Sequence, residues 1–158
     1  MLGYGAVKYA DLKGNRNSNY IFDYDRMLDP RGNTAIYMLY TGARLASILR
    51  KAGAPIGSAE SAALLSTAAL TLDHPAELAV AGALIRFQEN LERALTTLLP
   101  NHLCEYVYDL CGKVSTFVRE CKVLGSPEQN SRVLLVTASI MVIKQTLDLL
   151  GIGFLDKI

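Results

Sequence analysis

From residue 33 onward, apolar residues recur at steps of three and four, the spacing that lines one side of an α-helix. Proline, glycine and short polar residues interrupt this pattern repeatedly. The pattern predicts five helices, over about residues 33–52, 58–72, 73–99, 102–121 and 127–150. Short connections favour helices that run antiparallel to their neighbours. The expected fold class is therefore all-α, an antiparallel helical bundle.

Several of these helices begin at a residue that can cap them. A short polar side chain at this position accepts a hydrogen bond from a free backbone N–H group of the first turn. For the last helix, proline follows the expected cap and glutamine occupies the capping-box position, which makes this start the clearest boundary in the chain. The expected caps are Asn33 or Thr34, Ser58, Asp73 and Ser126.

The first 32 residues have a different character. A polar turn covers residues 13–19, aromatic and charged residues alternate after it, and the proline and glycine of residues 29–33 predict a second turn. This opening is too short to bury its own aromatic side chains. We expect these side chains to pack on the bundle or on a further domain; they are Tyr4, Tyr9, Tyr20, Phe22 and Tyr24.

The composition is that of an ordinary globular protein. Of the 158 residues, 51% are hydrophobic and 20% are charged, and the net charge is +1. These values argue against a disordered chain and against a strongly basic nucleic-acid coat protein, while a local basic stripe remains compatible with them. No apolar run is long enough to predict a membrane span. The odd number of cysteines, none in a CxxC pair, disfavours disulfides and favours a reducing compartment.

No set of residues predicts catalysis or metal binding. The two histidines, His74 and His102, lie near expected helix starts without a cysteine or carboxylate at metal-ligand spacing, so we interpret them as surface or capping residues. Cys104 is two residues from His102, and side chains two apart on a helix point away from each other. Cys104 and Cys111 share one side of a helix and are interpreted as core residues. The expected catalytic and metal-binding sets are therefore empty.

A group of tyrosines and basic residues on the first predicted helix is the remaining candidate. Tyr37, Tyr40 and Arg44 are three and four residues apart and can share one helical surface. Tyrosine rings stack on unpaired bases, and arginine binds phosphate or stacks as a cation. The alternative is that both tyrosines belong to the core, and the pattern by itself favours that alternative.

The chain also resembles a known family. Residues 5–53 resemble the segment of arginyl-tRNA synthetases that joins the catalytic domain to the anticodon-binding domain. The matching pieces there are GAVKYADL at 5–12, Asn15-Arg16, YIF at 20–22, DRML at 25–28 and GNTA at 32–35. HLCEYVYDL at 102–110, CKVLG at 121–125 and KQTLDLLGI at 144–152 are similar to later pieces of that family. The matches span nearly the whole chain in the family's order.

The resemblance implies a class I aminoacyl-tRNA synthetase, whose full-length form uses ATP and Mg²⁺ to attach arginine to its tRNA. The family's HIGH-type and KMSKS-type motifs are absent from this sequence. The chain is therefore expected to lack the ATP and arginine site, to hold no cofactor and to be inactive by itself. Residues 1–32 would be the C-terminal remnant of the catalytic and stem-contact region, and residues 33–158 the anticodon-binding bundle. A cytoplasmic location is expected, with an organellar form left open.

The resemblance also implies roles for individual residues and partners. Anticodon contacts are expected at Asn33, Thr34, Tyr37, Tyr40, Arg44 and Ile158, and stem contacts at Lys8, Asn15 and Arg16. The chain departs from the family pattern at Val118, where an aromatic residue is common, and at Ile158, where methionine is common. The expected partners are arginine tRNA through its anticodon stem-loop and the missing catalytic domain, with multi-synthetase assembly or self-association as further options. The alternative function is a helical protein-interaction module for synthetase assembly.

Overall fold

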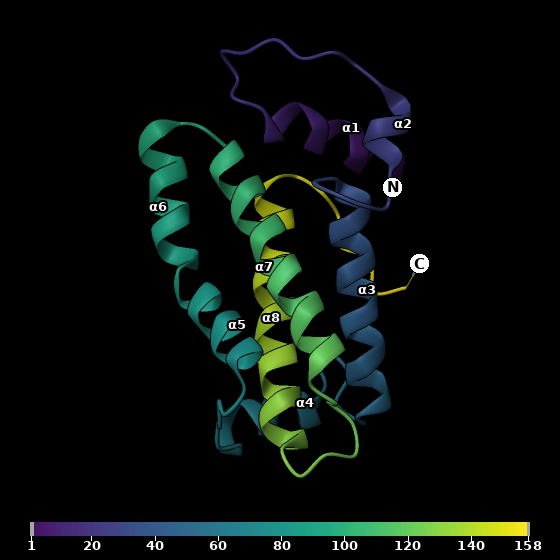
Figure 1. Ribbon diagram of the computed structural model, residues 1–158, viewed down its shortest axis with the longest axis vertical. Helices are drawn as coiled ribbons and strands as arrows, with labels where there is room; N and C mark the ends of the chain where they lie inside the picture. The colour runs from purple at the N-terminus through teal and green to yellow at the C-terminus, as the bar shows by residue number, and fades with distance from the viewer. Residues whose placement is uncertain (1, 158) are drawn as a thin grey trace.

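The computed structural model describes residues 2–157, and in this range it contains helices and no strand. Three long helices form the centre of the molecule: α3 (Ala35–Lys51), α7 (Asn101–Glu120) and α8 (Gln129–Leu149). Figure 1 shows α3 and α7 running in one direction and α8, which packs on both, running in the other. The expected all-α class and antiparallel bundle are confirmed.

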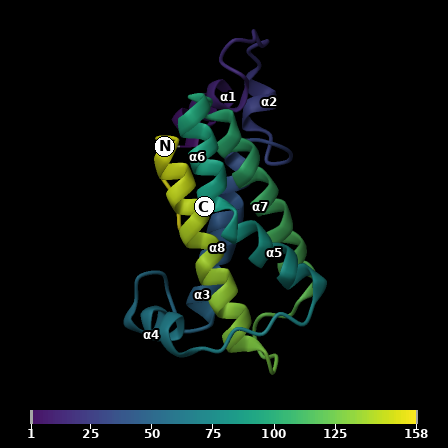
Figure 2. The same cartoon turned by 90° about the vertical axis from the view of Figure 1, so that its left-hand side faces the viewer.

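Five shorter helices surround this centre. They are α1 (Leu2–Lys13), α2 (Tyr24–Leu28), α4 (Ala59–Thr67), α5 (Pro75–Ile85) and α6 (Phe87–Thr97). In Figures 1 and 2, α1 and α2 lie across one end of the long helices, and α4 lies near the opposite end. The described residues thus hold eight helices where the pattern predicts five, because α1 and α2 form in the opening segment and the expected third helix is divided.

The division of the helix expected over residues 73–99 has a local cause. In an uninterrupted helix, the carbonyl of Ala83 would accept a hydrogen bond from the amide of Phe87. It accepts instead from the amide of Arg86, at 3.2 Å, and from the hydroxyl of Tyr106, at 3.1 Å. A side chain inserted into the backbone ladder is a known cause of helix breaks. The prediction of one helix is wrong because this hydroxyl comes from a distant part of the chain.

The cap predictions were right for two helices and wrong for two. Thr34 caps α3 by accepting from the amide of Tyr37 at 3.2 Å, and Ser58 caps α4. The cap of α5 is His74, not Asp73, since the His74 ring accepts from Ala76 while Glu77 accepts from the His74 amide. The last helix begins at Gln129, three residues after the expected cap Ser126. The helix expected to reach residue 72 ends at Thr67.

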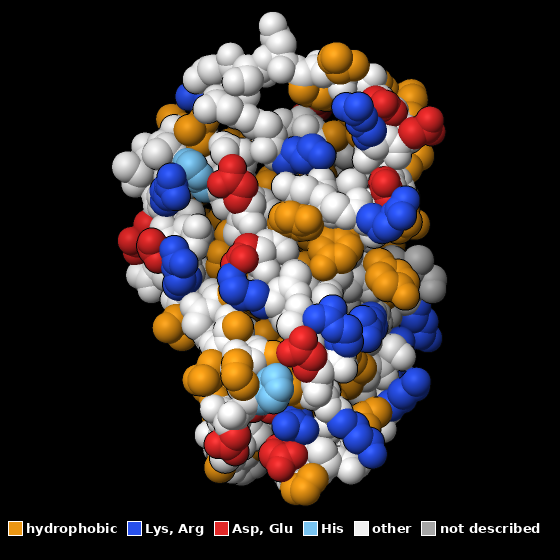
Figure 3. All heavy atoms as spheres, in the orientation of Figure 1, with side chains coloured by type: hydrophobic (Ala, Val, Ile, Leu, Met, Phe, Trp, Pro, Cys, Tyr) orange, Lys and Arg blue, Asp and Glu red, His pale blue; other side chains and the backbone are white. Residues whose placement is uncertain are grey.

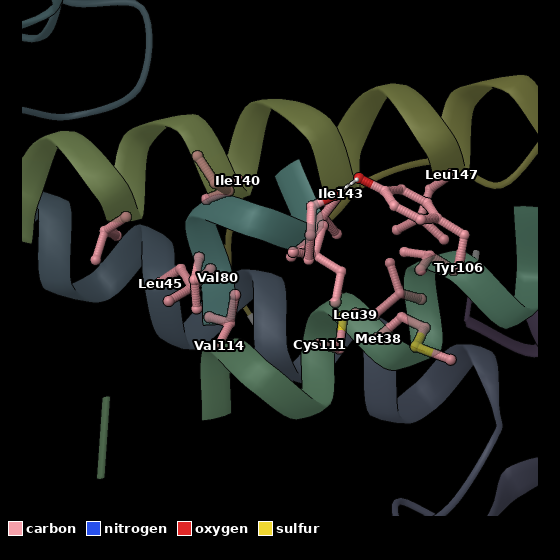
Figure 4. Packing of buried hydrophobic residues seen from close by; sticks show 14 of the residues in the cluster. Met38, Leu39, Leu45, Val80, Tyr106, Cys111, Val114, Ile140, Ile143 and Leu147 are labelled. Carbon is pink, nitrogen blue, oxygen red and sulfur yellow. Dashed lines mark hydrogen bonds between the residues drawn. The ribbon is translucent and has the colours of Figure 1, made fainter. Parts of the chain in front are cut away.

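The core lies where α3, α5, α7 and α8 meet, and it is filled mainly by aliphatic side chains, with aromatic rings and sulfur among them (Figure 4). Figure 4 shows side chains from all four helices directed toward one another, among them Met38, Val80, Cys111 and Ile143. The buried apolar surface of these side chains supplies the main force that holds the helices together. This core fixes the positions of the outward-facing residues on α3 and α7.

The opening segment is divided between buried and exposed residues. Tyr9 is fully buried, and its hydroxyl donates to Asn33 Oδ1, at 2.6 Å, or to the carbonyl of Cys104, at 2.9 Å. Helix α1 therefore packs on the bundle, as one of the two expected arrangements requires. The other aromatic side chains of the segment are exposed; they are Tyr4, Tyr20, Phe22 and Tyr24.

Candidate nucleic-acid interface

Three of the residues expected to contact RNA, Tyr37, Tyr40 and Arg44, lie on one side of α3. Tyr40 is 57% exposed, and Arg44 is exposed one turn further along the helix. Neither side chain has a hydrogen-bond or ion-pair partner among residues 2–157. Figure 3 shows hydrophobic side chains gathered over the border of α3 and α7, with Lys and Arg side chains beside them. An exposed ring next to an unpaired guanidinium is suited to contact a base and a neighbouring phosphate.

Tyr37 lies between the core and the surface. Its ring meets the ring of Tyr108 edge to face, with the centroids 5.8 Å apart and the planes at 70°. Its hydroxyl shares a hydrogen bond with Ser115 at 3.2 Å. Tyr37 is therefore held by α7 on one side while the rest of its ring borders a surface cavity. The pattern left open whether Tyr37 belongs to the core or to the surface, and the structure places part of the side chain in each.

Asn33 and Thr34 are bound into the turn that precedes α3. Asn33 Oδ1 is a partner of the Tyr9 hydroxyl, and the Asn33 carbonyl accepts from Lys13 Nζ at 2.9 Å. Thr34 is buried, donates to the carbonyl of Asp29 at 2.7 Å and caps α3. The hydroxyl of Thr34 thus has internal partners, so this residue orients the helix from which Tyr37 and Tyr40 project.

The three expected stem-contact residues lie apart from the α3 surface. Lys8 Nζ donates to the carbonyl of Gly151 at 2.8 Å and ties α1 to the turn after α8. Asn15 and Arg16 are exposed in the loop after α1, where Asn15 accepts from the amides of Asn17 and Ser18. The structure therefore brings Tyr37, Tyr40 and Arg44 together, and it places the stem-contact candidates at the α1 end of the molecule.

Ile158 lies outside the described residues. The tail before it follows α3, because the ring of Phe154 packs on Gly42 and the carbonyl of Asp156 accepts from Arg50 at 3.0 Å. A Cβ atom at Gly42 would lie 2.5 Å from that ring, so only glycine leaves room for it. At about 100° per residue, Gly42 and Arg50 each lie about 140° around α3 from Tyr37. The tail up to Asp156 is therefore on another side of α3.

The three cysteines are buried. Burial raises the pKa of the Cys104 and Cys111 thiols to about 12, so both remain protonated at neutral pH. None of the three cysteines forms a disulfide. Among residues 2–157, no group of three or more His, Cys, Asp and Glu side chains has a metal-binding arrangement. In the same range, no helix combines the length and the apolar character that crossing a bilayer requires.

Sequence reasoning missed the contribution of α7 to this surface. Tyr108, Asp109, Lys113 and Thr116 border a cavity together with Tyr37. The signal for Tyr108 was present, since it falls outside the apolar series that includes Tyr106 and Leu110 and so had to face away from the core. What the pattern did not contain was the pairing of α7 with α3, which depends on tertiary packing.

Comparison with known proteins relates this geometry to a family. A family model described as the DALR anticodon binding domain matches residues 38–158. The chloroplastic/mitochondrial arginine–tRNA ligase of Arabidopsis thaliana is 49% identical over 157 residues, which cover 99% of this chain and 24% of the relative. The cytoplasmic enzyme of the same plant is 47% identical, with 96% and 25% covered. The chain thus spans about a quarter of the length of the curated relatives it matches.

Solved structures agree with these matches. Arginyl-tRNA synthetase from Plasmodium falciparum superposes with a TM-score of 0.85 at 34% identity, covering 99% of this chain and 27% of that one. The Thermus thermophilus arginyl-tRNA synthetase gives 0.84 at 29% identity, with 100% and 27% covered. The exposed aromatic and basic side of α3 therefore belongs to a helical bundle shared with these synthetases. The chain is a member of the DALR anticodon-binding domain family, in the form that arginine–tRNA ligases contain.

Proposed function

We propose that this chain is the tRNA-anticodon-binding part of an arginine–tRNA ligase, and that the exposed side of α3 contacts the anticodon loop. The observation that carries the proposal is the position of Tyr40 and Arg44, adjacent, exposed and unpartnered on a family member's first long helix. Tyr40 stacks on an unpaired base, and Arg44 binds a phosphate beside it. Tyr37 and Asn33 border this contact, and Thr34 holds the helix start in place.

The parent enzyme attaches arginine to its tRNA with ATP, and Mg²⁺ assists the phosphate chemistry. In this proposal, those groups bind in the three-quarters of the ligase that lie outside this chain. The exposed aromatic and aliphatic side chains of residues 20–28 dock against that part; Ile21 is 86% exposed and Tyr24 63%. Asn15 and Arg16, in the adjoining loop, and Lys8 reach the stem of the tRNA.

The test is a calorimetric titration of the chain with an arginine tRNA anticodon stem-loop. Tyr40→Ala should weaken binding by about five- to one-hundred-fold, because one stacked base contributes roughly 1–3 kcal/mol. Tyr24→Ala removes a similarly exposed tyrosine on α2, outside the proposed contact on α3, and should leave the affinity unchanged. Equal binding by the unaltered chain and Tyr40→Ala, or no binding by either, contradicts the proposal.

A further inference from the structure

A cavity of about 360 Å³ lies between α5 and α7, next to the proposed RNA-contacting side of α3. Tyr37 and Tyr108 form one wall, and the small residues Ala79 and Gly112 leave space beside the helix backbones. A second cavity of about 460 Å³ adjoins it, since Ala79, Asp109 and Lys113 border both. Cavities of this size hold small planar organic groups.

The two rings in the wall are arranged to receive another ring. Because Tyr37 and Tyr108 meet edge to face, they do not stack on each other, and at least one ring face stays uncommitted. The hydrogen bond to Ser115 fixes Tyr37 on the inner side. Tyr108 is 38% exposed and has no hydrogen-bond partner among the described residues, so its ring is available at the surface.

The polar groups at the edge of the cavity are only partly used. Lys113 forms an ion pair with Asp109 through Oδ2, and Oδ1 has no partner within residues 2–157. The Thr116 hydroxyl, which also borders the cavity, has none either in this range. A carboxylate oxygen accepts from the amino group of a nucleobase such as cytosine or adenine, whereas uracil has no amino group.

We propose that this cavity holds one unpaired base of the bound RNA loop, stacked on Tyr108, with Asp109 Oδ1 accepting from the amino group of that base. The inference rests on the proposed function, because it needs the RNA loop to lie over α3. It adds a second base contact, on α7, to the contact at Tyr40, and it gives this domain a means to prefer one base over another.

The first experiment compares ring-removing and ring-keeping variants in a calorimetric titration with the arginine tRNA anticodon stem-loop. Tyr108→Leu should weaken binding by about tenfold, while Tyr108→Phe keeps the ring and should stay within about twofold of the unaltered chain. Tyr24→Leu is the matched control and should have no effect. Thermal melts of each variant report whether the fold is intact.

The second experiment identifies the base by replacing each loop nucleotide in turn with an abasic one. At the position that occupies the cavity, the abasic change should weaken binding to the unaltered chain and cause no additional loss with Tyr108→Leu. At that position, cytosine or adenine should bind more tightly than uracil by about fivefold. Asp109→Ala should remove this preference. Asp148→Ala should keep it, since Asp148 also pairs with a lysine four residues away but lies on α8.

The outcomes separate the two proposals. If the stem-loop binds and Tyr40→Ala weakens it, but Tyr108→Leu binds as the unaltered chain does, the cavity does not hold a base and the proposed function stands. If every abasic position loses equal affinity with both proteins, the stacking at Tyr108 is likewise contradicted. If the unaltered chain does not bind the stem-loop, both proposals fail.

Discussion

Two polar regions of this molecule differ in whether their polar groups have hydrogen-bond partners within the chain. The first, here termed the closed base, lies where α5 and α8 begin. There the Glu77 carboxylate, buried in the protein, accepts from Arg132 Nε at 2.7 Å and from the His74 amide at 2.9 Å. Arg132 also donates to the carbonyl of Lys122 and pairs with Glu128. The charged groups of this region are satisfied within the chain.

The second region, here termed the open face, is the exposed side of α3 with the neighbouring part of α7. Tyr40, Arg44 and Asp109 Oδ1 have no partner among residues 2–157. Both regions contain charged residues on helices, so the presence of such residues does not distinguish the two regions. The difference lies in whether the hydrogen-bonding capacity is used internally, and unused capacity beside an exposed ring is what suits a surface for a ligand.

The strongest test of the closed base is Arg132→Met. It leaves the Glu77 carboxylate buried with the His74 amide as its remaining donor, and breaking a buried ion pair costs about 3–5 kcal/mol. We expect the free energy of unfolding, measured with urea, to fall by about 3 kcal/mol. Arg93→Met, at an exposed position on α6, is the control and should change it by less than about 0.5 kcal/mol. If Arg132→Met is as stable as the unaltered chain, the ion pair between Arg132 and Glu77 does not stabilise the fold.

The pH dependence of stability sharpens the same point. Burial by itself would raise the pKa of Glu77, but the hydrogen bonds from Arg132 and from the His74 backbone outweigh it, and the pKa lies below its usual value. A lowered pKa in the folded state gives stability that is complete above the unfolded pKa of about 4.3 and is lost as the pH falls through the folded pKa.

Urea unfolding at a series of pH values between neutral and about 3 checks this expectation. The unaltered chain should lose stability over the acid end of the series. Glu77→Gln has no charge to titrate at this position, so its stability should start lower at neutral pH and change less with acid. Parallel curves for the two proteins would assign the acid sensitivity to other carboxylates.

Thr34→Ala separates the two roles predicted for Thr34, a helix cap and an RNA contact, of which the structure contains the cap. Removing the hydroxyl deprives α3 of its cap and should lower the free energy of unfolding by about 1 kcal/mol. Thr34→Ser keeps the hydroxyl and should restore most of that loss. At a temperature where both variants are folded, affinity for the stem-loop should stay within about twofold. A large loss of affinity in a stably folded Thr34→Ala would place this residue in the open face.

Arg44→Gln should give the smallest effect and no change in the melting temperature. Because one phosphate contact is lost, the slope of log affinity against log salt should become shallower by about 0.7, the value for one contact on a single strand. The measurement is a set of stem-loop titrations at several salt concentrations. Arg93→Gln, on α6, is the control. If both variants change the slope equally, Arg44 acts only as a general positive charge and makes no specific phosphate contact.

The fold could be predicted well where local signals and tertiary packing agree. The spacing of apolar residues located α3, α7 and α8 within a few residues, because each of these long helices has one side turned to the core. The prediction of one helix was wrong at Ala83, where the hydroxyl of Tyr106 bonds to the backbone carbonyl and the helix is interrupted. The residues around Ala83 could not predict this bond, because Tyr106 is 23 residues away in the sequence. The cap prediction was also wrong at Ser126: the Gln129 side chain accepts from the Gly125 amide instead of the Ser126 amide, and the helix starts at Gln129.

The candidate site was predicted in part for a similar reason. Helical spacing alone places Tyr37, Tyr40 and Arg44 on one surface, and the structure keeps them there. Their environment could not be predicted, because it depends on α7: Ser115 and Tyr108 fix Tyr37, while Tyr40 has no such neighbour. Exposure, which distinguishes a stacking ring from a core ring, is a property of the assembled bundle.

The burial of Tyr9 has a consequence for the limits of the unit that folds. The family match begins at Met38, yet Tyr9 fills a place in the core, and the cap of α3 lies at Thr34. A piece cut at the start of the match would lose a full-size core side chain and the first turn of its central helix at once. We therefore expect a stably folded fragment to need helix α1, and so to begin well before the first residue of the family match.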